Sequence, residues 1–146
     1  MKKSTWVKKP VKQLLKKLEE EFNRYIRIRD SDSNGLANCI SCNKQVQLGT
    51  IDCQAGHYVP VSMSSFWRFE EDNVNIQCSA CNNWKSGNVH DQRQGMQGKY
   101  GVKREREIWT NRHKQVIKWN KEDLVEKIFY YQKQAEEIAQ IKGLVV

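Results

Sequence analysis

Cys39-Ile-Ser-Cys42 and Cys78-Ser-Ala-Cys81 are the two short segments that decide how this chain folds. Two C-x-x-C pairs separated by 35 residues have the spacing of a structural zinc site with four thiolate ligands. His57 lies between the two pairs, and Asn82 directly follows the second pair. We therefore expect one metal centre that draws the intervening sequence into a compact unit. Its zinc ligands are predicted to be Cys39, Cys42, Cys78 and Cys81.

The chain has five cysteines, so one remains outside the two pairs. No apolar run is long enough for a signal peptide or a membrane span, so we expect the thiols to be in a reducing cytoplasm, where paired C-x-x-C motifs bind metal. The remaining thiol, Cys53, is interpreted as a small buried core residue or, alternatively, as part of a rearranged zinc site. With only 38% hydrophobic residues and a mean hydropathy of −0.81, the chain would also need zinc to stabilise a small core.

The formal charge of +8 is concentrated in two regions. Residues 1–29 contain ten Lys/Arg and three Glu, and residues 99–119 contain seven Lys/Arg and two Glu. Two basic regions around a metal-binding centre suit a nucleic-acid backbone, although basicity alone is equally consistent with a well-solvated surface. The side chains that we expect to contact DNA are Lys85, Arg93, Lys99, Arg104 and Arg106.

Apolar residues at three-to-four spacing predict an amphipathic helix over residues 7–29, with lysines on its outer face. The polar sequence Asp30-Ser-Asp-Ser-Asn-Gly35 is expected to end it. A short hairpin is predicted within residues 39–61, and a short helix over residues 78–87.

Glycines in residues 95–101 predict a turn or a broken helix, and the basic segment 102–119 is predicted to be helical. Asn120 has the character of an N-cap for a last helix that extends to about Ile141. The 4-3-4-3 rhythm of apolar residues in that helix indicates packing on the N-terminal helix or, alternatively, pairing with a second copy of the chain.

Hydrolysis of a phosphodiester needs a base to activate water and a cation to stabilise the developing charge. The ββα-metal (HNH) nucleases supply both from a hairpin and a helix: a histidine on the second strand is the base, and the hairpin and helix hold one divalent metal. This chain offers parts in that order, with His57 as the candidate base. Asn82 is a candidate ligand of Mg²⁺ or Mn²⁺, because amide oxygens suit hard cations, or else a helix cap.

Two asparagines compete for the middle position of an H-N-N signature, which holds the loop and orients the histidine. Asn73 is preferred, and Asn75 is the alternative. Lys85, one turn beyond Asn82, is placed to meet a backbone phosphate or is simply solvated. The other histidines, His90 and His113, are interpreted as surface residues or phosphate contacts.

The segments Phe22-Asn-Arg-Tyr-Ile-Arg-Ile-Arg-Asp30, Cys-Ile-Ser-Cys, Ala-Gly-His-Tyr and Cys-x-x-Cys-Asn-x-x-Lys-Ser-Gly-Asn88 together resemble the NinG/Rap recombination proteins of lambdoid phages. The likeness extends from about Leu14 to Gly101. This family is associated with phage recombination and with structure-specific cleavage of branched DNA, including Holliday junctions and D-loops. The Cys-x-x-Cys-Asn element is also similar to phage endonuclease VII resolvases, which are zinc-clamped, dimeric ββα-metal nucleases.

The resemblance implies that the paired cysteines bind zinc, that His57 is the base and that Asn82 ligates the catalytic metal. One departure concerns the second metal ligand. Resolvases commonly have an aspartate directly before the histidine, where this chain has Gly56. Members of the family can carry an acid three residues before it, where this chain has Gln54, expected on the same strand face as His57. Asp52 is the nearest carboxylate, so we expect the metal to be held by Asp52, either directly or through water, or weakly by Gln54.

The sequence thus predicts an α+β fold with a small zinc-clamped, HNH-like ββα-metal core in residues 37–95. A basic amphipathic helix in residues 1–36 and basic and amphipathic helices in residues 96–146 flank this core. The predicted function is that of a Mg²⁺- or Mn²⁺-dependent, structure-specific endonuclease for branched DNA, active as a homodimer in the cytoplasm of a phage-infected bacterium. The alternatives are a non-catalytic zinc module that binds DNA junctions, a sequence-specific HNH endonuclease and an RNA-binding ribbon protein.

Overall fold

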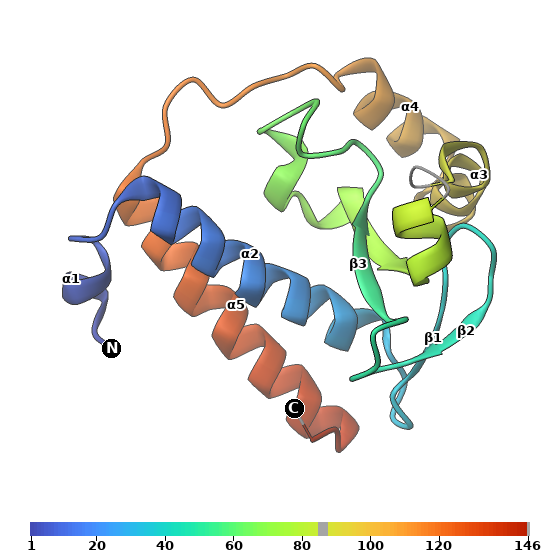
Figure 1. The fold of residues 1–146 in the computed structure, drawn as a ribbon, viewed down its shortest axis with the longest axis horizontal. Helices are drawn as coiled ribbons and strands as arrows, with labels where there is room; N and C mark the ends of the chain where they lie inside the picture. The colour runs from blue at the N-terminus through green and yellow to red at the C-terminus, as the bar shows by residue number, and fades with distance from the viewer. Residues whose placement is uncertain (85–87, 146) are drawn as a thin grey trace.

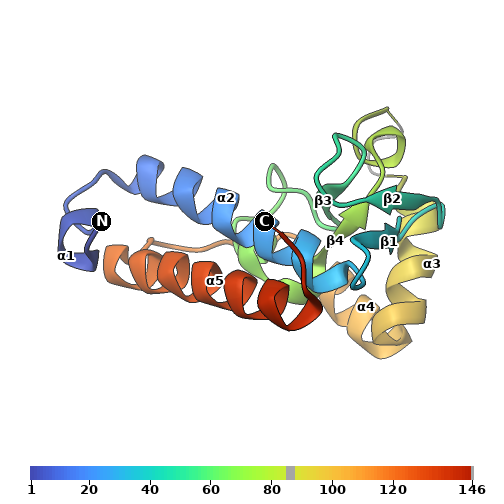
Figure 2. The same cartoon turned by 90° about the horizontal axis from the view of Figure 1, so that it is seen from below.

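The computed structural model describes residues 1–84 and 88–145. Two long helices, α2 (Val11–Asp30) and α5 (Lys121–Lys142), lie side by side in one half of the molecule (Figures 1 and 2). Short strands and the helices α3 (Val89–Tyr100) and α4 (Val102–Thr110) form the other half. This combination of helices and small sheets confirms the predicted α+β class.

Helix α2 begins at Val11, not at Val7 as the apolar spacing predicted. Pro10 occupies its N-cap position with φ −60° and ψ 150°. A proline disfavours helical angles in the residue before it and donates no backbone hydrogen bond, so the chain forms a separate short helix, α1 (Lys3–Trp6), ahead of the proline. The predicted end of the helix at Asp30 is confirmed.

The N-terminus of α5 is capped as predicted. The Oδ1 atom of Asn120 accepts a hydrogen bond from the backbone amide of Asp123 at 3.0 Å, which satisfies one of the free amides of the first turn. Gly143 ends the helix with a left-handed φ of 71°.

Helices α2 and α5 enclose the main hydrophobic core and run in the same direction (Figure 2). The ring of Phe22 is completely buried and packs edge-on against Tyr131 and Phe69, with centroids 4.9 and 5.7 Å away. Such aromatic pairs add about 0.5–1.5 kcal/mol to the burial of the rings themselves. Of the two arrangements predicted for the last helix, the structure therefore has the one in which it packs within the chain. Other fully buried members of this core are Leu14, Leu18, Ile26, Ile128 and Ala135.

Two separate antiparallel sheets replace the single hairpin predicted within residues 39–61. The strands pair as β1 (Leu36–Asn38) with β2 (Gln45–Gln47) and β3 (Gln54–His57) with β4 (Val74–Gln77). The first C-x-x-C motif forms the turn between β1 and β2, so the partner of β2 precedes Cys39. As a result His57, opposite Val74, lies on the first strand of its pair and not on the second. The 3-10 turns η1 (Trp67–Phe69) and η2 (Glu71–Asn73) lie between β3 and β4.

The helix predicted over residues 78–87 is a short π-helical turn, η3 (Ala80–Trp84), and residues 85–87 lie outside the described part of the chain. The predicted broken helix is confirmed at Gly101, where φ is 91° and α3 ends before α4 begins, but α3 continues through Gly95 and Gly98. Gly95 has a packing role: a Cβ atom there would lie 1.9 Å from the carbonyl oxygen of Ile40. The glycine lets α3 approach the first cysteine pair closely.

The helix predicted over residues 102–119 ends at Thr110, and the chain then crosses irregularly to α5. Gln115 shows why the segment leaves the helix. Its Oε1 accepts from the backbone amide of Ser65 at 3.0 Å, and its Nε2 donates to the carbonyl of Met63 at 2.7 Å. These contacts with the loop after β3 override the weak local preference for helix.

Arg29, near the end of α2, joins the helix pair to the strands. Its guanidinium donates to the carbonyl oxygens of Glu71 at 2.9 Å and Val74 at 2.8 Å, and its Nε lies 2.8 Å from the carboxylate of Asp30. Lys99 of α3 reaches the same carboxylate at 3.0 Å. Burial by itself raises the pKa of the Asp30 carboxyl. The hydrogen bonds and charge of Arg29 outweigh burial and bring that pKa below its usual value. Buried charges are stable only when paired in this way.

We predict opposite effects for two alanine substitutions in α3. Gly95→Ala should lower the free energy of unfolding by about 2 kcal/mol or more, since the added methyl group collides with the backbone at Ile40. Gly98→Ala, with nothing within 4 Å of its added Cβ, should raise it by about 0.5–1 kcal/mol through helix propensity. Urea unfolding of both variants with excess zinc measures the difference. Equal effects of the two changes would contradict the close-approach role of Gly95.

Candidate functional site

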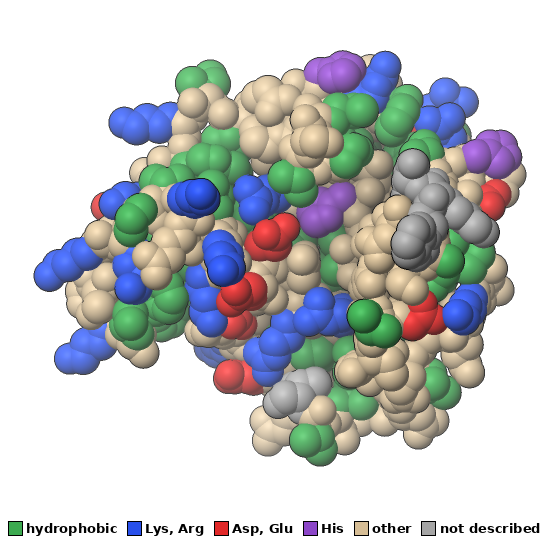
Figure 3. Space-filling view, viewed as in Figure 1, with side chains coloured by type: hydrophobic (Ala, Val, Ile, Leu, Met, Phe, Trp, Pro, Cys, Tyr) green, Lys and Arg blue, Asp and Glu red, His purple; other side chains and the backbone are tan. Residues whose placement is uncertain are grey.

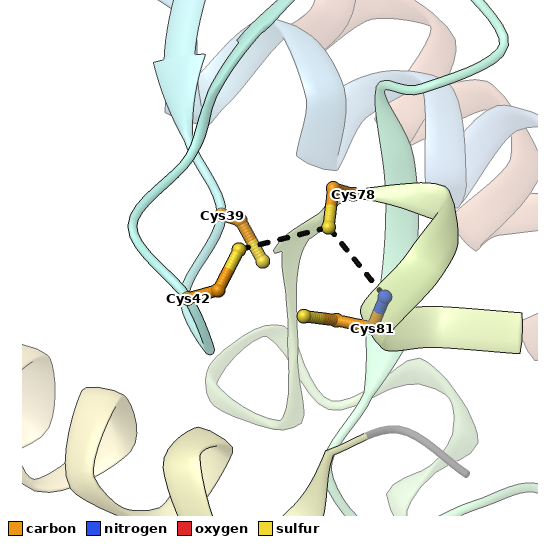
Figure 4. Close-up of side chains that lie close together, drawn as sticks. All are labelled: Cys39, Cys42, Cys78 and Cys81. Atoms are coloured by element: carbon orange, nitrogen blue, oxygen red, sulfur yellow. Dashed lines mark hydrogen bonds between the residues drawn. The ribbon is translucent and has the colours of Figure 1, made fainter. Parts of the chain in front are cut away.

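Four cysteines from two distant segments meet in one cluster (Figure 4). Their sulfur atoms all lie within 4.8 Å of one another, and Cys42 Sγ is 3.7 Å from Cys78 Sγ. Tetrahedral zinc with Zn–S bonds of about 2.3 Å needs sulfur atoms about 3.8 Å apart. The cluster therefore fits a structural zinc ion held by Cys39, Cys42, Cys78 and Cys81.

The local backbone presents these thiols for binding. Cys39 and Cys42 lie in the turn between β1 and β2, where Asn43 adopts a left-handed φ of 64°. Cys78 follows β4, and the backbone amide of Cys81 lies 3.5 Å from Cys78 Sγ. Cys53 is buried, with 5% exposure, in the small core beside the cluster but is not one of its members.

A pocket of about 410 Å³ opens between α2, β3 and α3. The polar side chains along it include Glu19, Asn23, His57, Asn82 and Gln92. The structure thus brings His57 and Asn82, which are far apart in the sequence, to one cavity. Figure 3 shows the side of the molecule on which α2 and β3 face the viewer, with lysine and arginine side chains spread over the α2 half.

The ring of His57 is held in a defined orientation. Its Nε2 atom lies 2.9 Å from the carbonyl oxygen of Arg68. A carbonyl oxygen can only accept a hydrogen bond, so Nε2 carries the proton of the neutral ring and Nδ1 keeps a free lone pair. Burial lowers the pKa of His57, while the bond to Arg68 and the charge of Glu19 act in the opposite direction.

Asn73 is completely buried and holds the loop between β3 and β4. Its Oδ1 accepts from the amide of Val59 at 2.8 Å, and its Nδ2 donates to the carbonyl oxygens of Val59 and Trp67 at 3.0 Å each. Trp67 directly precedes Arg68, whose carbonyl oxygen bonds His57 Nε2. The alternative, Asn75, has its Oδ1 bonded to Arg29 and Lys99 at 3.1 and 2.7 Å, and its Nδ2 donates to the carbonyl of Asp72 at the end of that loop at 3.3 Å.

Asn82 lies in η3 beside the zinc cluster, and its Nδ2 donates to Gln54 Oε1 at 2.9 Å. The expectation that Gln54 shares a strand face with His57 is wrong. Side chains alternate along a strand, so Gln54 lies on the face of Gly56 and opposite to His57. An aspartate in place of Gly56 would require the Gln77 side chain to move, because a Cβ atom there would lie 1.8 Å from Gln77 Oε1.

Asp52, the carboxylate predicted from the sequence, is engaged elsewhere. Its Oδ2 lies 2.7 Å from Lys44 Nζ, and its Oδ1 accepts from both the backbone amide and the hydroxyl of Ser79, at 2.9 and 2.8 Å. The hydrogen bonds with Lys44 and Ser79 hold its pKa at about 2. Asp52 thus fixes the start of the turn that carries Asn82 and does not line the His57 pocket.

Most of the predicted DNA contacts have partners within the chain. Arg93 bonds Tyr58, Lys99 bonds Asp30, and Arg104 bonds Asp72, at 2.8, 3.0 and 2.9 Å. Arg106 is 70% exposed, 3.9 Å from Glu105, and Lys85 lies outside the described residues. His90 and His113 are exposed. Among the described helices, none is both long and apolar enough to cross a bilayer.

Among the pocket side chains that sequence reasoning missed are Glu19 and Asn23 on α2 and the amide of Gln92 on α3. Glu19 and Asn23 are four residues apart and therefore share one face of their helix, which is the one signal that could have paired them. Their position beside His57 depends on how α2 packs on β3, which local sequence patterns do not encode.

For the metal cluster we predict one zinc ion per chain. Cys81→Ser should remove it, because a hydroxyl is a poor replacement for a thiolate ligand, and should destabilise the fold. Cys53→Ala should retain one zinc ion per chain, since Cys53 lies outside the cluster. Zinc content of the two purified variants, measured by plasma mass spectrometry, checks both statements. Loss of zinc on changing Cys53 would point to a rearranged ligand set.

Comparison with known proteins places the chain in a family. The family model described as "Bacteriophage Lambda NinG protein" matches residues 1–141. Protein ninG of Escherichia phage lambda is 34% identical over 111 residues, which are 75% of this chain and 51% of that protein. Protein ninG of Escherichia phage 933W is 32% identical over 115 residues, 79% of this chain and 53% of that protein.

The P22 relative, from a Salmonella phage, is 37% identical over 81 residues, 56% of this chain and 36% of that protein. The chain thus spans about half the length, or less, of these curated relatives. No solved structure matches it. Because the family model covers nearly the whole sequence, and the lambda relative agrees over three quarters of it, the chain belongs to the NinG family of bacteriophage proteins.

Proposed function

We propose that this chain is a divalent-metal-dependent endonuclease that nicks branched DNA during phage recombination. The observation that carries the proposal is the bond of His57 Nε2 to the Arg68 carbonyl at 2.9 Å, within a pocket that also contains Asn82. It leaves Nδ1 free to take a proton from water. The lowered pKa keeps the ring neutral, and so able to act as a base, near pH 7.

The residues around His57 have separate tasks in this mechanism. His57 accepts the proton of the attacking water, and Asn73 secures the loop that orients the ring. Asn82 donates through Nδ2 to Gln54, so its Oδ1 remains as an acceptor suited to Mg²⁺ or Mn²⁺. When bound, such a cation supplies Lewis-acid stabilisation of charge on the phosphate.

The substrate is proposed to lie along the basic helical side of the pocket. The exposed lysines on the helix face that carries Glu19 and Asn23 are Lys12 and Lys16, and Lys2 and Lys8 are exposed in the segment before α2. They have the free charge that Arg93, Lys99 and Arg104 lack, because those three are paired within the chain. A homodimer would present two such sites to the two-fold-related strands of a branch, and both the dimer and the branched substrate are parts of the proposal.

A zinc-stabilised module that binds DNA junctions without cutting them is the second candidate. One observation favours it: the strand offers Gln54 and Gly56 where related nucleases are expected to carry an acid, so β3 brings no negative charge to a cation.

The base assignment predicts that His57→Ala lowers the rate of nicking of a synthetic four-way junction by at least ~100-fold, because water then loses its proton acceptor. Junction affinity should stay within a few-fold of wild type. His113→Ala, which changes an exposed histidine, is the control and should cut normally. Nicking would be followed on junction and linear duplex with Mg²⁺, Mn²⁺ or EDTA. Tight binding without cleavage by the wild type under any metal would establish the binding module instead.

Because β3 carries no acidic side chain, we predict that Gln54→Asp increases the nicking activity. The new carboxylate would lie next to Asn82 and attract the divalent cation, so we expect roughly tenfold faster nicking at limiting Mn²⁺. Gln45→Asp makes the same chemical change at an exposed position on β2 and should have no such effect. A Gln54→Asp variant that cuts no faster at any Mn²⁺ concentration would show that this position does not contact the metal.

A further inference from the structure

A carboxylate of helix α2 lies at the pocket that contains the proposed base. Glu19 is the single acidic side chain among the described residues that line it. Its Oε2 atom is 3.3 Å from Arg68 Nη2, and the side chain is 39% exposed. Among the described residues no hydrogen bond to Oε1 is present, so this oxygen remains available to a ligand.

The negative charge of Glu19 lies in the same pocket as the proposed base, His57. A carboxylate beside the base of a phosphodiesterase repels the phosphate that must approach it. The guanidinium of Arg68 neutralises part of this charge through Glu19 Oε2. The backbone carbonyl of Arg68 is occupied by its hydrogen bond with His57. A divalent cation bound to Glu19 would reverse the sign of the local field and attract the phosphate.

Two buried amides in the same pocket lack the partners that buried polar groups require. Gln92 is completely buried, and neither its Oε1 nor its Nε2 makes a hydrogen bond with any described residue. The Oδ1 atom of Asn23, one helical turn from Glu19, is also buried and unbonded. Since buried amides are nearly always satisfied, these atoms indicate a polar ligand or its waters between α2 and α3.

The pocket has room for such a ligand. Its volume is about 410 Å³, and water occupies roughly 30 Å³ per molecule, so on the order of a dozen waters would fit. A hydrated divalent cation, which carries up to about six waters, fits with space left for a phosphate group.

We infer that the pocket between α2, β3 and α3 holds a divalent cation, Mg²⁺ or Mn²⁺, with the carboxylate of Glu19 as its charged ligand. Asn82 contributes an amide oxygen, and the unbonded amide atoms of Asn23 and Gln92, which are closed to solvent in this structure, turn toward the pocket to bind the waters of the cation. The role of this cation in cleavage rests on the proposed function, but its binding does not. Helix α2 thereby supplies the acid that β3 lacks, although the sequence indicated this helix only as part of a basic region suited to a nucleic-acid backbone.

The test is Mn²⁺ binding to the zinc-loaded full chain, followed by electron paramagnetic resonance of free Mn²⁺. The thiolate cluster retains zinc, because Mn²⁺ prefers oxygen ligands, so the signal reports the pocket. Glu19→Gln keeps an oxygen for Arg68 but removes the charge, and it should weaken Mn²⁺ binding at least tenfold. Glu20→Gln, on the exposed side of the same helix, should bind within twofold of wild type. Circular dichroism of both variants would show that α2 is intact.

Junction nicking measured on the same samples separates this inference from the proposed function. Mn²⁺ binding that depends on Glu19, without nicking, would leave the cation site standing and refute the nuclease. Nicking and Mn²⁺ binding that are both unchanged in Glu19→Gln would leave the nuclease standing and overturn this inference. Two further results would overturn the cation site: no Mn²⁺ binding to the wild type at millimolar concentration, or equal binding by the wild type and Glu19→Gln. Glu19 would then be only an ion-pair partner of Arg68.

Discussion

The four-thiolate cluster is the constraint on which the β-rich half of this protein depends. Each sheet has only two short strands, and such pairs are marginal on their own in water. The cluster ties the turn between β1 and β2 to the segment after β4, so the two sheets share one cross-link. Asn82 follows the last of these cysteines directly, and its position relative to β3 is set by that cross-link and by the bond of its amide to Gln54. The metal centre thus determines where a candidate ligand of the functional site lies.

A second joint, at Arg29, attaches this half to the helix pair. The guanidinium of Arg29 bonds backbone carbonyls on either side of the start of β4, and Asp30 receives Lys99 from α3. The backbone amide of Ile76 in β4 also donates to Asp30 Oδ2 at 3.3 Å, so polar bonds as well as apolar packing join α2 to the strands. Directional bonds between buried charges specify the orientation at which α2 crosses the strands. That orientation brings Glu19 to the pocket of His57.

Local chemistry in the sequence predicted part of this structure. The C-x-x-C spacing identified the thiols that meet, because four such ligands are what one zinc ion needs. The N-cap character of Asn120 marked the start of the last helix, because a cap depends on neighbouring residues alone. Predictions failed where distant contacts decide the backbone. Gly95 suggested a break, but it lies inside a helix since α3 presses on Ile40. In the site, the sequence identified His57 and Asn82, which share one pocket, but proposed Asp52, which instead bonds Ser79. Glu19 reaches that pocket only through packing between elements.

The distribution of charge in the site follows from steric constraints on β3 as well as from the residue types around the pocket. On β3, the Gln77 side chain occupies the volume beside Gly56, so a larger residue before His57 would require Gln77 to move. The next position on that face, Gln54, has a neutral side chain bonded to Asn82. The strand therefore supplies the base but no negative charge. On the other side of the pocket, α2 carries an acid whose partner, Arg68, also holds the histidine through its carbonyl. Base and acid both contact Arg68 in the loop after β3, so a shift of that loop would alter the contacts of both groups.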